Sequence, residues 1–296
     1  KVKNDAVDAL ALAQWLLLQR PDCFKMPSSK AAELKSIARF RTFQMQIIGD
    51  CKRKVIAILD QLFPEYERFF SDIFGAASVA VLLRYPSARA LSRTHIGSLT
   101  CLLEKSSRGR LGAELAIRLR DRAKDSFAAN AAVESQSMAL VQLLAQIEFS
   151  KKQLKAIDKK MKSLLDAAAT PITTIPGIGT VCAASILGEI GDIACFRKPS
   201  SLVAYAGLDP SVFQSGEFTG TRNHLSKRGS AYLRWALWIA ADRARMFDPA
   251  FKAYYAKKRA EGKCHKVAIT AVARKLCNTI FAVLTRDTKY VCPVAG

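Results

Sequence analysis

Two aspartates near the start of the chain have a spacing that could hold a metal ion. Asp5 and Asp8 lie in the segment KNDAVDALALA, three residues apart. In a helix this spacing places both carboxylates on one face, with Cβ atoms about 5–6 Å apart. Paired carboxylates can share Mg²⁺ in a two-metal site for phosphoryl transfer, which needs further carboxylates from elsewhere. Two acids in a first helical turn also complement the helix dipole, so the pair alone leaves both roles open.

A serine in the segment FQSGEF, residues 213–218, is a second candidate. Ser215 precedes Gly216, and this dipeptide is first of all a turn. A serine hydroxyl is a weak nucleophile unless a neighbouring group activates it. The nearest histidine along the chain is His224, which does not have the spacing typical of a serine–histidine pair. Spacing alone therefore does not identify Ser215 as a nucleophile.

The segment IPGIGTVCAASILGEIG, residues 175–191, predicts a tight hairpin that opens a helix at Thr180. Gly177 and Gly179 allow the backbone to come close to a neighbour, and the amides at a helix N-terminus can hold a phosphate. The pattern resembles a helix–hairpin–helix element, which binds the DNA backbone without reading its sequence. A plain corner between two helices would use the same residues.

The charge of the chain points to a polyanionic partner. There are 46 Lys and Arg against 25 Asp and Glu in 296 residues, a net charge of +21. Nucleic acid is the first candidate for such a partner, and an anionic membrane surface is the second. Residues 217–275 alone hold 14 Lys and Arg against 4 Asp and Glu. A solvated surface is the alternative use of such a run, and the size of the excess favours binding. The basic residues expected to contact nucleic acid are Lys35, Arg39, Arg222, Lys227, Arg228 and Arg234.

The elements that must position these residues are predicted to be mainly helices. Residues 1–20 predict a helix capped by Asn4 or Asp5, and residues 29–60 predict a long basic amphipathic helix. Residues 65–126 predict shorter helices. A compact unit follows from residue 170, with one extended stretch at 211–222.

Residues 133–165 carry a heptad. Leu140, Ile147, Leu154 and Met161 recur every seven residues, and Ser150 interrupts the second register of the pattern. This repeat predicts a coiled coil, formed either within the chain or between two copies.

Composition excludes several other classes of protein. Half of the residues are hydrophobic and 24% are charged, which argues against a wholly disordered chain. The longest uncharged run, Ala167 to Gly188, contains two prolines and several threonines, so we expect a loop and a buried helix there and no membrane span. The eight cysteines contain no C-x-x-C pair, so we expect free thiols in a reducing compartment.

Taken together, these segments resemble the bacterial insertion-sequence transposases that have a RuvC-like DEDD domain, a helical coiled-coil segment and a C-terminal transposase domain. Two blocks carry the resemblance. KNDAVDALALA is similar to the end of the RuvC-like domain. The C-terminal block comprises TIPGIG (174–179), LVAYAGLDP (202–210), Ser215–Gly216 and LSKRGSAYLRWAL (225–237).

The resemblance implies a division into 1–25, the end of a RuvC-like domain, 26–168, a helical and coiled-coil region, and 169–296, the transposase domain. It implies that Asp5 and Asp8 bind Mg²⁺ and that Ser215 attacks a DNA phosphate. It also implies that a structured bridge RNA guides the recombination, that the chain forms a homo-oligomer through the coiled coil, and that it acts on DNA in the bacterial cytoplasm, at the nucleoid.

This sequence departs from the family pattern in one respect. The first Asp and the Glu of the acidic tetrad come from strands that precede KNDAVDAL in the family, and no such strands are present here. We therefore expect a fragment or a truncated gene product that binds nucleic acid and does not recombine DNA alone. A non-catalytic nucleic-acid-binding scaffold is the rival hypothesis, and a basic coiled-coil interaction protein is a third, which leaves the Pro-Gly-Ile-Gly hairpin without a purpose.

Overall fold

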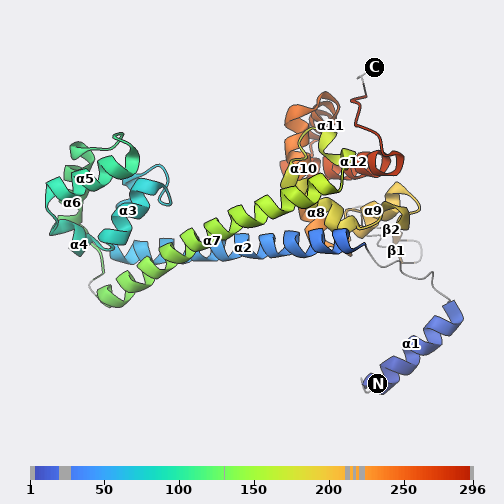
Figure 1. Cartoon of the computed structure of the whole chain (residues 1–296), viewed down its shortest axis with the longest axis horizontal. Coiled ribbons are helices and arrows are strands. Elements are labelled where there is room, and N and C mark those ends of the chain that lie inside the picture. Colours follow the sequence, from blue (N-terminus) through green and yellow to red (C-terminus); the bar gives the residue numbers. More distant parts are fainter. Residues whose placement is uncertain are drawn as a thin grey trace. The chain divides into compact units, whose positions relative to one another are not determined.

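The computed structural model describes residues 4–19, 28–129, 131–210, 214–215, 218–219 and 224–293. Helices dominate this part of the chain, as predicted, and its two strands span two residues each (Figure 1). The chain divides into two compact units. The inserted unit is Ile37–Ser163, and the split unit combines Lys1–Ser36 with Leu164–Gly296. The three-part division at residues 25 and 168 stays a prediction.

Helix α1, Asp5–Gln19, begins where the sequence predicts. The side chain of Asn4 accepts a hydrogen bond from the amide of Ala6 at 3.0 Å, and its carbonyl accepts from the amides of Val7 and Asp8. Asn4 is thus the capping residue, one of the two that were expected. The described side chains of α1 are exposed, including that of Trp15 at 51%.

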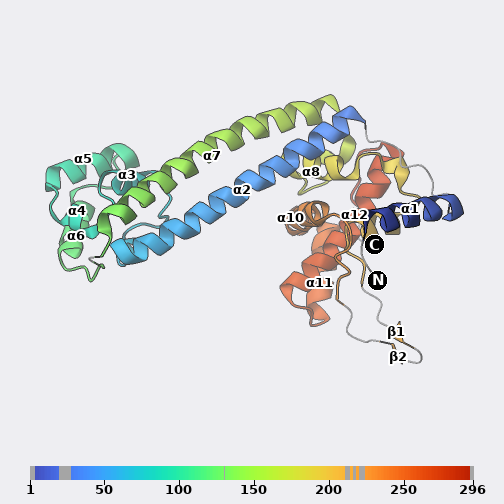
Figure 2. The ribbon, with the colours of Figure 1, turned by 90° about the horizontal axis from the view of Figure 1, so that it is seen from below.

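Two long helices form the framework of the inserted unit. Helix α2 spans Ser29–Leu62 and helix α7 spans Val133–Ala167, and the parts of both that belong to this unit run side by side (Figure 1, Figure 2). The guanidinium Nε of Arg41 donates to the carboxylate of Asp158 at 2.6 Å and joins them. All four predicted heptad residues are buried: Leu140, Ile147, Leu154 and Met161. The first three share a core with residues of α2, including Val55 and Leu59, so the heptad face is covered from within the chain.

Shorter helices complete the inserted unit. They are η1 (Tyr66–Phe69), α3 (Ala76–Arg84), α4 (Ala88–Ser92), α5 (Ile96–Ser107) and α6 (Ala113–Lys124). Glu65, just before η1, is 3% exposed and joins this region to the end of α6. One of its carboxylate oxygens accepts from Arg122 at 3.0 Å and the other from the hydroxyl of Ser126 at 2.7 Å. The buried carboxylate is therefore hydrogen-bonded on both oxygens, as burial of a charge requires.

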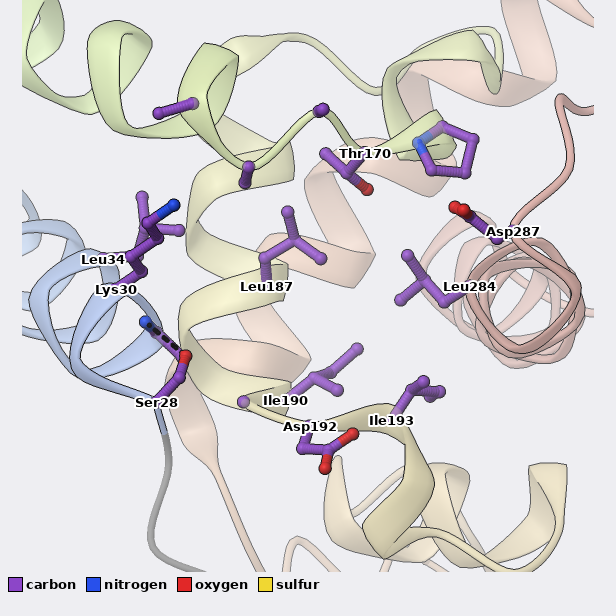
Figure 3. Close-up of a pocket in the computed structure, with 16 residues that line it drawn as sticks. Ser28, Lys30, Leu34, Thr170, Leu187, Ile190, Asp192, Ile193, Leu284 and Asp287 are labelled. Carbon is purple, nitrogen blue, oxygen red and sulfur yellow. Dashed lines mark hydrogen bonds between the residues drawn. The ribbon is translucent and has the colours of Figure 1, made fainter.

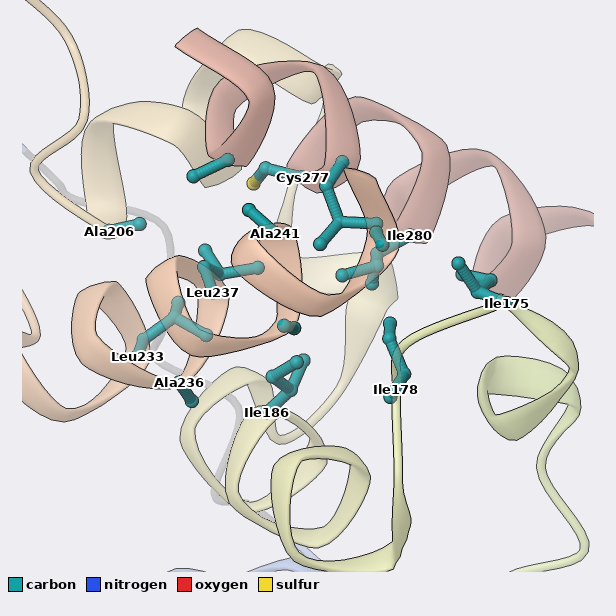
Figure 4. Packing of buried hydrophobic residues seen from close by; sticks show 14 of the residues in the cluster. Ile175, Ile178, Ile186, Ala206, Leu233, Ala236, Leu237, Ala241, Cys277 and Ile280 are labelled. Carbon is teal, nitrogen blue, oxygen red and sulfur yellow. The ribbon is translucent and has the colours of Figure 1, made fainter. Parts of the chain in front are cut away.

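Helix α10, Ala231–Phe247, lies at the centre of the split unit. It contacts α8 (Thr180–Ile190), α11 (Pro249–Ala260) and α12 (His265–Arg286). Figure 4 shows the core between them, where Leu237 and Ala241 of α10 pack with Ile186 of α8 and Cys277 and Ile280 of α12. Small side chains on α10 allow this close packing. The remaining elements are η2 (Pro171–Thr174), η3 (Ile193–Cys195), α9 (Pro199–Tyr205), β1 (Gln214–Ser215) and β2 (Phe218–Thr219).

One expectation about an apolar helix needs correction. The apolar residues Trp235, Leu237, Trp238 and Ile239 surround their helix almost completely, which predicts that all of them are core, but Trp235 is 46% exposed, because α10 buries only one face. Helix α12 is long and apolar enough to cross a membrane by length and composition alone. Its apolar side chains, among them Ile269, Val272 and Leu276, are buried in the core of the split unit.

Candidate functional site

The Pro-Gly-Ile-Gly hairpin opens α8 at Thr180, as predicted. Gly177 has a φ of +91°, and a Cβ there would lie 2.4 Å from the amide nitrogen of Ala244 in α10. Only glycine fits this approach, so packing accounts for Gly177. Gly179 caps α8 without a side-chain hydrogen bond, is exposed, and has open space where a Cβ would be. The amides of the first turn of α8 are therefore the part of the hairpin that can receive an anion.

The two remaining motif segments of the C-terminal block bind each other and form what we call the clasp, residues 205–210 and 225–230. The amide of Ser230 donates to the carbonyl of Tyr205 at 2.9 Å, and the amide of Ser226 donates to the carbonyl of Asp209 at 2.9 Å. Pro210 and Leu225 form an antiparallel bridge. The clasp brings together two segments that lie 15 or more residues apart in the sequence.

Glycines allow the two halves of the clasp to meet. Gly207 and Gly229 have φ values of +64° and +89°. A Cβ on Gly229 would lie 2.2 Å from the carbonyl oxygen of Tyr205, and a Cβ on Gly207 would lie 2.3 Å from that of Arg228. The clasp is also tied to α8, because the hydroxyl of Ser230 donates to the buried carboxylate of Glu189 at 2.8 Å. These contacts account for Gly207 in the first segment and for Gly229 and Ser230 in the second.

Ser215 lies in the small insert that the clasp closes. Strands β1 and β2 pair antiparallel, with Gln214 opposite Thr219 and Ser215 opposite Phe218. The described residues of the stretch predicted to be extended, 214–215 and 218–219, are thus strands. Pro210 and Leu225, which precede and follow the insert in the sequence, form a bridge with each other. The turn residue Gly216, and Arg222, lie outside the described residues.

The other predicted basic contacts of this region lie in or beside the clasp. Lys227 and Arg228 form its exposed turn, in which Lys227 has a φ of +51°. Arg234 is half-buried, and its guanidinium donates to the carbonyl of Ala206 at 3.0 Å. Lys227 and Arg228 are thus free to meet a phosphate, whereas Arg234 already holds the end of α9.

A cavity of about 750 Å³ opens beside the clasp, and we call it the base cavity. Its lining includes Pro210, His224, Leu225, Lys227, Lys266 and Arg274. No Asp or Glu of the described chain lines it. Three cations face one space at the foot of the insert that carries Ser215, which makes this cavity suited to an anion.

A second cavity of the split unit, of about 570 Å³, has a different character (Figure 3). Apolar side chains such as Leu187, Ile190 and Leu284 line it, together with the carboxylates of Asp192 and Asp287. Lys30 is the single cation among the described residues that line it. Its charges do not favour a phosphate, so the base cavity is the better candidate for nucleic acid.

The remaining predicted residues belong to elements other than the clasp. Asp5 and Asp8 are exposed in the first turn of α1, and no group of three or more metal-binding side chains occurs among the described residues. Lys35 belongs to the split unit, where its backbone packs 2.6 Å from the Cβ position of Gly188. Arg39 is exposed and belongs to the inserted unit.

Lys266 and Arg274 are candidate site residues that the sequence did not predict. Both belong to the basic run 217–275, but nothing singled them out. Their spacing with Thr270, at four and eight residues, is the signal that places them on one face of a helix. Their position at the clasp depends on the packing of α12 against α9 and α10, which the sequence does not display.

Comparison with known proteins shows which sequences this chain resembles. Residues 169–256 match the model of the transposase IS116/IS110/IS902 family. The chain is 29% identical to the uncharacterized 44.8 kDa protein of insertion element IS116 from Streptomyces clavuligerus, over 98% of the chain and 73% of that protein. It is 25% identical to the 43.6 kDa protein of insertion element IS110 from Streptomyces coelicolor, over 98% and 72%.

A protein whose name gives a different role matches part of the chain. The pilin gene-inverting protein of Moraxella bovis is 32% identical over 43% of this chain and 39% of its own length. The clasp and the hairpin both fall within residues 169–256. Over those residues the chain matches the model of the transposase IS116/IS110/IS902 family, and along 98% of its length it is similar to insertion-element proteins.

Proposed function

We propose that this protein is a DNA transposase or recombinase that cuts and rejoins DNA strands at the clasp. The match of residues 169–256 to a transposase family carries the proposal. The similarity to insertion-element proteins and to a pilin gene-inverting protein supports the same class, since both kinds of process rearrange DNA. The net charge of +21 supports DNA as the partner.

In this proposal Ser215 is the nucleophile. Its Oγ forms a bond to a DNA phosphorus, the bond from that phosphorus to the leaving sugar oxygen breaks, and the hydroxyl proton ends on the leaving oxygen. The phosphodiester energy is kept in the protein–DNA ester, so the strand can be rejoined to a new end by the reverse step. The clasp supports this role because it holds both ends of the insert on a rigid core.

Asp5 and Asp8 are the proposed ligands for Mg²⁺. Two carboxylates fit the usual way in which Mg²⁺ is bound, by one or two acids, several waters and the phosphates of the substrate. They do not fit a two-metal site by themselves. When bound, the ion would supply charge neutralisation at the phosphate. The remaining proposals that follow from the resemblance are a guide RNA, a homo-oligomer and a place of action in the cytoplasm.

The experiment is a denaturing gel with end-labelled DNA of the insertion sequence and the purified chain joined to an upstream segment that supplies the two missing acids of the tetrad. The expected result for a competent protein is a covalent protein–DNA band that is lost in Ser215→Ala and kept in Gln214→Ala, the neighbour in the same strand. Asp5→Ala and Asp8→Ala are expected to weaken the band and to be partly rescued by excess Mn²⁺, whereas Ser215→Ala is not. A band that persists in Ser215→Ala places the nucleophile elsewhere. Salt-sensitive DNA binding without any covalent band favours the scaffold hypothesis.

A further inference from the structure

The base cavity contains cations that have no acidic partner among the described residues. Lys227, Lys266 and Arg274 line it, and no salt bridge joins any of them to a described residue. Other cations of the split unit are paired, such as Arg245 with Asp242 at 2.8 Å and Lys258 with Glu261 at 2.8 Å. Three like charges around one cavity repel one another, and binding an anion relieves that repulsion. The cavity therefore has an electrostatic reason to bind a phosphate.

Helix α12 sets the spacing of two of these cations. Lys266 and Arg274 are eight residues apart, with Thr270 between them also lining the cavity. At 1.5 Å per residue their Cα atoms are separated by about 12 Å along the helix axis. Phosphates of one DNA strand advance by about 3.4 Å each, so the two side chains span about three to four phosphates. The face of α12 that carries Lys266 and Arg274 therefore matches an extended DNA backbone better than a single small anion.

The position of the cavity links it to Ser215. Pro210 and Leu225, which bridge at the foot of the insert, also line the cavity. Ser215 follows Pro210 by five residues, and five residues reach at most about 17 Å. This distance corresponds to about five phosphates along one strand. A strand held in the cavity is thus within reach of the insert.

We propose that Lys266 and Arg274, with Lys227, form a phosphate clamp that holds the DNA backbone within about five nucleotides of the phosphate at Ser215. They are positioning residues, because they act on the strand and not on the reacting atoms. The proposal rests on the proposed function for the identity of the strand. Lys266 and Arg274 lie outside residues 169–256, so the family match does not assign them.

Lysine footprinting tests the clamp directly. The full chain is acetylated with and without a duplex oligonucleotide, and the modified lysines are quantified by mass spectrometry. We expect Lys227 and Lys266 to be protected by DNA more strongly than Lys257, an exposed lysine of α11 that does not line the cavity. Arg274→Gln should reduce the protection of Lys266. Equal protection of Lys266 and Lys257 would overturn the proposal.

Salt dependence of binding gives a second measurement. Fluorescence anisotropy titrations at several salt concentrations measure the slope of log K against log salt, which is negative. Lys266→Ala and Arg274→Ala should each make this slope shallower by about 1. Lys266→Arg should retain the slope, and unchanged melting temperatures would show that these exposed positions leave the fold intact. A slope of Lys266→Ala equal to that of Lys257→Ala contradicts the clamp. Neither measurement needs a covalent adduct. The clamp can therefore be disproved while the adduct test still supports Ser215 as the nucleophile, and the adduct test can fail while the clamp is supported.

Discussion

Gly207 and Gly229 let two segments of the clasp approach more closely than any side chain permits. Both adopt positive φ, and a Cβ on either would lie within 2.3 Å of a backbone oxygen. Gly262 is a matched comparison, because its φ is +77° and nothing lies within 4 Å of its Cβ position. Substitution of Gly262 by alanine tests the loss of stability caused by the positive φ alone. Substitution of Gly207 or Gly229 adds the loss caused by a steric clash.

We predict that Gly229→Ala destabilises the protein more than Gly262→Ala by about 1–3 kcal/mol, because only the first adds a clash to the strained φ. Urea denaturation of both variants measures the difference. The covalent adduct should also be lost in Gly229→Ala, because the insert loses its anchor. Equal denaturation midpoints would show that the clasp accommodates the added methyl group without a loss of stability.

The same comparison can be made inside the Pro-Gly-Ile-Gly hairpin. We predict that Gly177→Ala lowers the melting temperature, because its Cβ would lie 2.4 Å from the backbone of α10. Gly179→Ala should be tolerated, because its Cβ position is open. Thermal melting followed by circular dichroism checks both. A Gly179→Ala variant as unstable as Gly177→Ala would contradict the packing role assigned to Gly177.

Glu65 couples the stability of the inserted unit to pH. Burial by itself raises the pKa of this carboxyl, but the hydrogen bond from Ser126, further hydrogen bonds and the charge of Arg122 together hold the pKa below its usual value. A carboxyl with a lowered pKa in the folded state stabilises that state above its unfolded pKa of about 4.3. This contribution is lost as the pH falls through the lowered folded value.

We predict that Glu65→Gln costs about 1–3 kcal/mol at neutral pH and that the difference from the parent shrinks below about pH 4. Glu67→Gln, two residues away and exposed, serves as the control and should cost little at either pH. Urea titrations at the two pH values give the comparison. A Glu65→Gln effect that stays constant with pH would assign the loss to packing and not to charge.

At the residue scale, the sequence predicted which residues cap or begin an element better than it predicted which distant residues they contact. Asn4 as a cap, Thr180 as the first residue of a helix and the extended insert around Ser215 all follow from local chemistry. The packing role of Gly177 and the buried contact of Arg234 do not, because each depends on a neighbour far away in the sequence. Trp235 was misplaced since apolar residues on every face of α10 give no sign of which face is covered.

At the scale of elements, the long helices α2 and α7 show what the heptad predicts and what it does not. The heptad predicted that Leu140, Ile147, Leu154 and Met161 are buried, and they are. It could not identify the partner, because the apolar spacing of α2 is interrupted by polar residues such as Gln44 and Arg41. The structure shows that α2 of the same chain shares the core with this face.

We predict that Ile147→Lys destabilises the inserted unit by several kcal/mol, because it places a charge at a position only 2% exposed. Phe149→Lys, two residues along the same helix and 57% exposed, should cost far less. Thermal melting checks both variants, and sedimentation checks their mass. If Ile147→Lys changes the oligomeric state and leaves the melting temperature unaltered, the heptad face joins two copies instead.

At the scale of the whole molecule, charge governs binding. The net charge of +21 predicts that DNA affinity falls about 10³–10⁵-fold between 50 and 200 mM salt if six to ten phosphates are neutralised. Anisotropy titrations with two duplexes of unrelated sequence measure this fall, and both should give the same slope. A slope shallower than about −2 would mean that the basic surface is mostly solvated.

The division into units also sets an order for folding during synthesis. The inserted unit is continuous, so it can fold soon after the ribosome has made residue 163. The split unit cannot, since the first turns of α2 must wait for Gly188 of α8, about 150 residues later. At about 5–20 residues per second this wait lasts about 8–30 s, and the core closes only when α12 is made. Residues such as Ala31 and Leu34 are exposed to water and to chaperones throughout that interval, so the first turns of α2 are where a nascent chain is most open to misassembly.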